Sequence, residues 1–101
     1  MSRVRLTNVW DRWRRIRRNE FLRFGMKPEN AEFISRGEAA ARQRMSPVIG
    51  HKAAAGAKLE FVPNTYGQEK VVFAIDPEMV PLSKREAAAK ELGVNRIATF
   101  R

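Results

Sequence analysis

Apolar residues recur at helical spacing through the first quarter of the chain. Six of them follow one another at steps of mostly three or four residues: Val9, Trp10, Trp13, Ile16, Phe21 and Phe24. This period is typical of an amphipathic helix. Thr7 or Asn8 can cap its start, Asp11 lies in the first turn where the helix dipole favours an anion, and Gly25 supplies a left-handed residue to end it. The pattern predicts a helix over residues 7–24, with both tryptophans packed in a core.

A second helical pattern extends from Pro28 to about Met45. Proline is tolerated at the first helical position, and the apolar residues after it keep a helical period: Ala31, Ile34, Ala41 and Met45. Ser46 precedes Pro47 and is therefore biased away from helical backbone, so we expect the helix to end there. Residues 46–57 are rich in glycine and alanine and short of large side chains, which predicts a flexible connection with little to bury.

Apolar residues at every second position replace the helical period after residue 57. This pattern appears in Leu59, Phe61 and Pro63 and again in Val71, Phe73 and Ile75. The five residues Asn64 to Gln68 between these runs contain Gly67 and suit a hairpin loop. We therefore predict two antiparallel strands, at 58–63 and 70–76.

The C-terminal part begins with a turn bracketed by Asp76-Pro77 and Pro81. Ser83 with Glu86 three residues later forms a capping-box signature for a helix through Leu92, and Gly93 followed by an apolar residue is a typical helix stop. Residues 94–100 are expected to form either a third strand or the beginning of another helix.

This same segment, Ser83 to Val94, resembles the first helix and turn of helix-turn-helix DNA-binding proteins. That family has a small residue four positions before the turn glycine, and here Ala89 stands four before Gly93. The resemblance covers about a fifth of the chain. It implies a recognition helix in which Asn95, Arg96 and Thr99 face the major groove. The chain departs from the family at Thr99, where an apolar residue is usual, and a capped helix entering a strand explains the same residues.

Together these elements predict a single small α+β domain over residues 1–101. Two N-terminal helices and a third helix would pack against a small antiparallel sheet of two or three strands. The chain has no cysteine, which rules out disulfides and thiolate chemistry. No apolar run approaches the roughly 20 residues that span a bilayer. We therefore expect a protein of the cytoplasm or of a nucleoprotein particle, with no membrane partner.

Charge is concentrated at the N-terminus of this chain, whose net charge is +9. Eight arginines lie in the first 24 residues, against two acids: Arg3, Arg5, Arg12, Arg14, Arg15, Arg17, Arg18 and Arg23. Because the guanidinium fork fits phosphate and carboxylate, this density predicts a docking surface for a polyanion. We expect a nucleic-acid-binding protein, for DNA or RNA, that contacts the phosphate backbone with the helix arginines and an adjacent groove with a basic arm over residues 1–6.

An alternative belongs to a different class. The arginine helix can instead dock on an acidic protein surface, in a small assembly subunit of a virion or ribonucleoprotein or in an inhibitor of a nucleic-acid-handling complex. An exposed apolar anchor beside the arginines would favour this alternative, and Leu22, Met26 and Tyr66 are the residues expected to remain exposed. A third reading is a basic helix lying on an anionic membrane, which requires exposed tryptophans.

Catalytic signals are absent from the sequence. The only histidine, His51, has no carboxylate or serine at a spacing that would orient it, and Glu29, Glu32 and Glu38 suit helix-dipole and ion-pair roles with Arg36 and Arg42. No metal-ligand spacing or phosphate-binding glycine loop occurs. We therefore expect no enzymatic activity, no cofactor and no metal.

Overall fold

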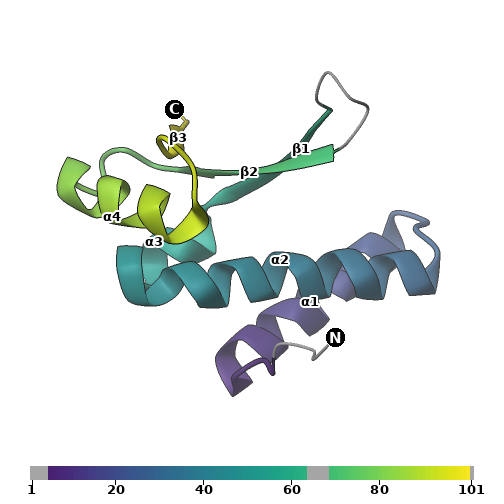
Figure 1. Cartoon of the computed structure of the whole chain (residues 1–101). Coiled ribbons are helices and arrows are strands. Elements are labelled where there is room, and N and C mark those ends of the chain that lie inside the picture. Colours follow the sequence, from purple (N-terminus) through teal and green to yellow (C-terminus); the bar gives the residue numbers. More distant parts are fainter. Residues whose placement is uncertain (1–4, 64–68, 101) are drawn as a thin grey trace. The chain divides into compact units, whose positions relative to one another are not determined.

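The computed structural model of the chain describes residues 5–63 and 69–100 (Figure 1). Of these, residues 60–63 and 69–72 are described by their backbone alone. Within these residues it contains four helices and a three-stranded sheet, which confirms the α+β class. The chain divides into two compact units, residues 1–44 and 45–101. The single domain expected from the sequence stays a prediction.

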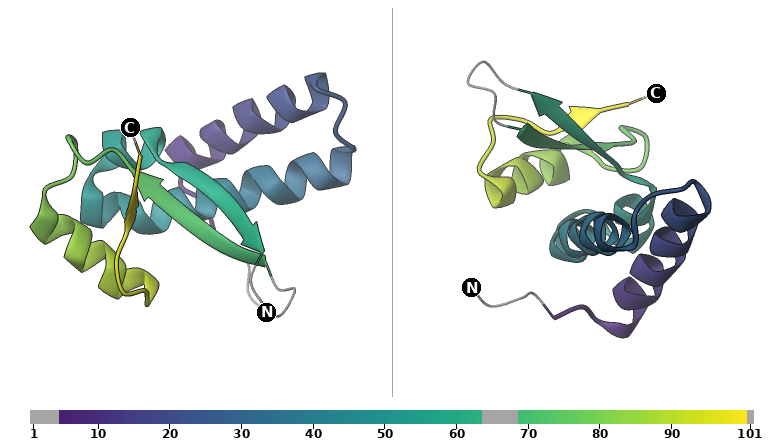
Figure 2. Two further views of the ribbon diagram at one scale, coloured as in Figure 1. Left: turned by 90° about the horizontal axis from the view of Figure 1, so that it is seen from above. Right: turned by 90° about the vertical axis from the view of Figure 1, so that its right-hand side faces the viewer.

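The first unit is a helical hairpin. Helix α1 covers Asn8–Arg23, and the turn that follows leads into helix α2, Pro28–Ile49 (Figure 2). The stop at Gly25 is confirmed, because this residue has φ +90°, a conformation that glycine adopts without a steric penalty. Thr7 is the N-cap of α1, although its side chain makes no capping hydrogen bond. The capping residues and Gly25 were thus enough to predict both ends of α1 to within a residue.

Helix α2 does not end at Ser46, as the sequence pattern predicts, but continues through Pro47 to Ile49. The rule used for Ser46 is a preference of local sterics, and burial opposes it here: Met45 and Ile49 are both buried on the face that the helix keeps through its last turn. The helix ends at Gly50, which has φ +94° and donates its amide hydrogen to the Ser46 carbonyl at 2.8 Å. Burial of this face therefore outweighs the proline.

Residues 51–57 also differ from the prediction. Instead of a connection with little to bury, His51–Gly56 form helix α3, and Ala53, Ala54 and Ala57 are buried. Alanine has the highest helix propensity of any residue, so the alanine run was a helix signal that the two flanking glycines obscured.

Two strands form the predicted hairpin. Strand β1, Lys58–Pro63, pairs antiparallel with strand β2, Glu69–Ile75, in a register that places Lys58 opposite Ala74 and Pro63 opposite Glu69. The predicted loop 64–68, with Tyr66, lies outside the described residues. The alternation of the sequence thus located both strands to within a residue.

The third strand makes the sheet mixed, whereas the sequence analysis expected it to be antiparallel. Strand β3, Ala98–Thr99, pairs parallel with β2, giving the order β1-β2-β3. Helix α4, Leu82–Leu92, connects the two strands, and such a helical crossover returns the chain in the direction of the first strand. Of the two readings for residues 94–100, the strand is confirmed. The described residues after Gly93 contain no helix, so the recognition helix implied by the helix-turn-helix resemblance is absent.

The start of α4 also corrects a prediction. Pro81 is its N-cap, no side chain caps it, and Ser83 already lies in the first turn, so the capping box is not formed. Its stop is as predicted, since Gly93 is left-handed with φ +70° and the Val94 amide donates to the Ala89 carbonyl at 2.9 Å. The helix packs its alanine face inward, with Ala88 and Ala89 both buried.

Candidate nucleic-acid interface

Helix α1 has an inward and an outward face, and the two differ in chemistry. The inward face is set by residues at steps of four, three and four, namely Trp10, Arg14, Arg17 and Phe21, and it meets α2. Trp10 is 4% exposed, and its ring centroid lies 6.3 Å from that of Trp13. The predicted burial is thereby confirmed for Trp10, while Trp13 and Phe21 are half-buried. A buried Trp10 is not available to insert into a membrane surface.

Arg14 is the residue that ties α1 to α2 most closely. Its Nη1 lies 2.8 Å from both carboxylate oxygens of Glu32, and its Nε donates to Asp11 Oδ1 at 3.0 Å. The Arg14 side chain is only 11% exposed. Charge-assisted contacts of this length are the stronger kind of hydrogen bond, and here they use most of the guanidinium donors. Arg14 therefore stabilises the hairpin and has little capacity left for a phosphate.

Arg17 is held in a similar way, one turn further along α1. Its guanidinium lies 4.6 Å from the Phe21 ring centroid and 5.9 Å from that of Trp13, and it pairs with Glu20 and with Glu38 of α2, the latter at 3.5 Å. Two carboxylates and two aromatic rings thus surround one cation. Arg17 belongs to the helix interface as well.

Arg42 completes this interface from the α2 side. It is buried, its guanidinium lies 4.4 Å from the Trp13 ring centroid, and its Nη1 donates to the Glu38 carbonyl at 3.1 Å. Burial lowers the pKa of Arg42, the Glu38 charge raises it, and the nearby Arg17 charge lowers it. Trp13 therefore lies against two cations, and Glu38 offsets the repulsion between them.

The outward face of α1 carries the arginines that remain exposed. Arg12, Arg15 and Arg23 recur there at steps of three and eight residues, which keeps them on one side of the helix. Arg15 makes a 3.5 Å contact with Asp11 but is still 57% exposed. Within the described part of the chain no ion pair involves Arg12 or Arg23, and Arg23 Nε lies 3.5 Å from the Asn19 carbonyl. These three side chains form the outer arginine row.

The other predicted arginines lie at the margins of this row. Arg18 is partly exposed and reaches Glu32 at 3.8 Å, so it lies between the two faces. Arg5 is exposed, and Arg3 lies outside the described residues. The structure therefore divides the predicted set: Arg12, Arg15 and Arg23 stand together on the outside, whereas Arg14 and Arg17 are committed to α2.

The end of the predicted basic arm is attached to α2 by one side chain. The Gln43 Oε1 accepts a hydrogen bond from the Thr7 amide at 2.8 Å, and the Gln43 Nε2 donates to the Arg5 carbonyl at 3.0 Å. One amide group thus satisfies a donor and an acceptor of the extended backbone before α1. This fixes the direction in which the chain enters the helix.

Apolar residues also lie on the outer side of α1. Val9 and Ile16 are seven residues apart and therefore on one face, and they are 55% and 51% exposed. The helical period predicts that both belong to the apolar stripe, because a period of three or four does not reveal which of two adjacent faces meets the partner helix. Of the anchors expected from the sequence, Leu22 is exposed and Met26 is half-buried. Phe24 and Phe33, both strongly exposed, were missed.

Net charge differs between the two units. Residues 1–44 hold twelve basic and five acidic side chains, whereas residues 45–101 hold eight and six. Among the described residues, no group of histidine, aspartate and glutamate side chains can hold a metal ion, and no helix is long and apolar enough to cross a membrane.

No protein-family model, curated protein or solved structure matches this chain.

Proposed function

We propose that the protein binds nucleic acid, DNA or RNA, without enzymatic activity, by laying the outer arginine row of α1 along a phosphate backbone. The observation that carries the proposal is the exposure of Arg12, Arg15 and Arg23 on one side of a helix whose opposite side is occupied by α2. Arginine is the residue best suited to bidentate phosphate contacts.

The length of the row supports this reading. Eleven residues separate Arg12 from Arg23, and at the helical rise they lie about 16 Å apart along the axis. One strand of a duplex advances about 3.4 Å per phosphate along its own axis, so the row can run beside about four or five phosphates. Arg18, at the margin of the row, and the exposed Arg5 before α1 add further positive charge. Contacts of this kind position a protein on the backbone and carry no base information, so we expect weak sequence preference.

The test is duplex and single-strand binding at 150 mM salt, compared between the wild type and a triple variant with Arg12, Arg15 and Arg23 changed to Gln. Three charge-assisted contacts are lost, so the affinity should fall by about a hundredfold or more. The matched control changes Lys52, Lys84 and Lys90 to Gln. These lysines are exposed, so their substitution removes the same amount of positive charge from residues 45–101. Equal losses in both variants would show that net charge alone attracts the nucleic acid.

A second candidate is supported by a different observation, the exposed pair Val9 and Ile16 beside Arg12. Exposed aliphatic side chains make no hydrogen bond or ion pair with a phosphate backbone, whereas a protein interface combines apolar anchors with arginines. The partner would be an acidic protein surface, as in the assembly-subunit alternative. The variant Val9→Thr with Ile16→Thr leaves the charge unchanged. It should preserve nucleic-acid binding if the first proposal holds, and it should abolish capture of an acidic partner if the second does.

A further inference from the structure

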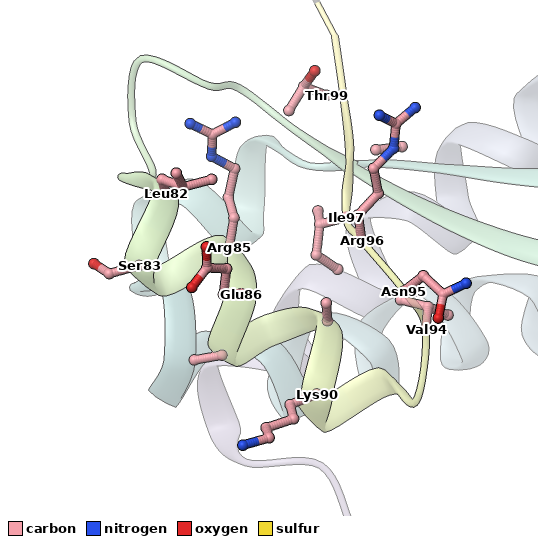
Figure 3. Close-up of a pocket in the computed structure, with 13 residues that line it drawn as sticks. Leu82, Ser83, Arg85, Glu86, Lys90, Val94, Asn95, Arg96, Ile97 and Thr99 are labelled. Carbon is pink, nitrogen blue, oxygen red and sulfur yellow. The ribbon is translucent and has the colours of Figure 1, made fainter.

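A second basic feature lies in residues 45–101 and does not involve α1. A cavity of about 900 Å³ opens there between α4 and the segment that leads into β3 (Figure 3). One part of its lining is apolar and is formed by Leu82, Ala89, Val94 and Ile97. Polar side chains from α4 and from the 94–99 segment line the rest. A volume of this size is in the range of small-molecule sites.

Two arginines from separate elements reach the same end of this cavity. Arg85 projects from the first turns of α4 and Arg96 from the segment before β3, and both extend toward the end where Thr99 lies (Figure 3). In the described part of the chain no ion pair involves either residue. The Arg85 Nε is buried and has no hydrogen-bond partner there. An anion bound at this end of the cavity would supply the negative charge that neither guanidinium group finds in an ion pair among the described residues.

The first turn of α4 adds to this positive end. Leu82 and Ser83 line the cavity, and no side chain caps the helix start at Pro81. The backbone N–H groups of an uncapped first turn and the helix dipole both favour a negative charge. The lining of this cavity thus includes two guanidinium groups, residues of a helix N-terminus and the Thr99 hydroxyl.

We propose that this cavity binds a phosphate monoester of a small apolar or partly apolar molecule. A tetrahedral phosphate presents oxygens in several directions, so it can accept from two guanidinium forks on different elements, whereas a planar carboxylate pairs fully with one. The apolar wall at Val94 and Ile97 would hold the organic part. Glu86 and Lys90 also line the cavity with opposite charges, so the net positive charge of the lining equals that of the two arginines, which suits a single phosphate.

The test is a titration of the full chain with phenyl phosphate, followed by amide chemical shifts at 150 mM salt, with inorganic phosphate and benzoate as parallel probes. Phenyl phosphate should shift the amides of the first turn of α4 and of residues 95–99, and it should bind about tenfold more tightly than either parallel probe. Absence of saturable shifts with phenyl phosphate at millimolar concentration would overturn the proposal. Equal affinity for benzoate would overturn the choice of phosphate.

Single-residue variants distinguish binding at this site from general electrostatic attraction of an anion to a basic protein. Arg85→Gln and Arg96→Gln should each weaken phenyl phosphate binding about tenfold or more, since each removes a charge-assisted contact. Lys84→Gln is the matched control, because Lys84 is exposed, neighbours Arg85 and does not line the cavity. It should leave the affinity within about twofold. Equal weakening in all three variants would contradict a defined site. Arg96 is itself exposed, so its variant is expected to fold and keeps the test decisive.

Discussion

Arginines of one helix serve different purposes at the scale of single residues. Arg14 and Arg17 face α2 and pair with its carboxylates, while Arg12 and Arg23 face outward. The sequence predicts a polyanion contact for all of them, because a run of basic residues does not show which of them point at a second helix. Glu32 and Glu38, two acids of the following helix, were the available signal.

This division predicts unequal effects on stability. Arg14→Gln should lower the free energy of unfolding by about 1 to 2 kcal/mol, because it leaves the half-buried Glu32 without its closest cation. Arg12→Gln, an identical chemical change on the outer face, should alter it by less than about 0.5 kcal/mol. Urea denaturation followed by tryptophan fluorescence measures both. A larger loss for Arg12→Gln would contradict the assigned faces.

Glycine substitutions test the backbone at the same scale. Gly37 lies within α2, is exposed and has open space where a Cβ would lie, so Gly37→Ala should stabilise the protein by about 0.5 to 1 kcal/mol. Gly93 also has open space but is left-handed, with φ +70°, so Gly93→Ala should destabilise it by about 1 to 2 kcal/mol. Thermal unfolding of the two variants should therefore shift in opposite directions. A shift of the same sign would refute one of the two backbone assignments.

At the scale of elements, the sequence predicted what local signals determine and missed what tertiary burial determines. The start of α2 at Pro28, the stops at Gly25 and Gly93 and the β1–β2 hairpin depend on local preferences and were predicted. The continuation of α2 past Pro47 depends on buried Met45 and Ile49, which a local rule does not include. The parallel pairing of β3 was missed, because strand direction depends on the crossover through α4 rather than on residues 94–100.

Pro47 offers a direct test of that longer helix. Proline in a helix interior lowers the free energy of unfolding by up to about 3 kcal/mol relative to alanine, and its restriction of the unfolded chain raises it by about 1 kcal/mol. Pro47→Ala should therefore stabilise the protein by about 1 to 2 kcal/mol. Pro28→Ala is the control, because Pro28 occupies the first helical position and no hydrogen bond is missing there. It should be neutral or slightly destabilising in the same melting experiment. A destabilised Pro47→Ala variant would contradict a helix that extends to Ile49.

At the scale of the whole molecule, charge is distributed unevenly along the chain. The excess of seven basic side chains in residues 1–44 compares with an excess of two in residues 45–101. Ion pairs within the hairpin leave this net charge unchanged but determine which cations can meet a partner. We therefore propose the outer arginine row as the docking surface for a polyanion, and the cavity beside α4 as a site for a much smaller anion.

The most direct test of this account is the salt dependence of duplex affinity in two charge-matched double variants. One carries Arg12→Gln with Arg23→Gln, and the other carries Arg14→Gln with Arg17→Gln. The outer double variant should keep the wild-type melting temperature and reduce the slope of log affinity against log salt by about 1.8, as expected for two lost phosphate contacts. The inner double variant should melt at lower temperature and, where it remains folded, keep a slope within about 0.5 of the wild type. If the inner variant instead melts normally and loses the larger part of the slope, the assignment of the two arginine faces is wrong.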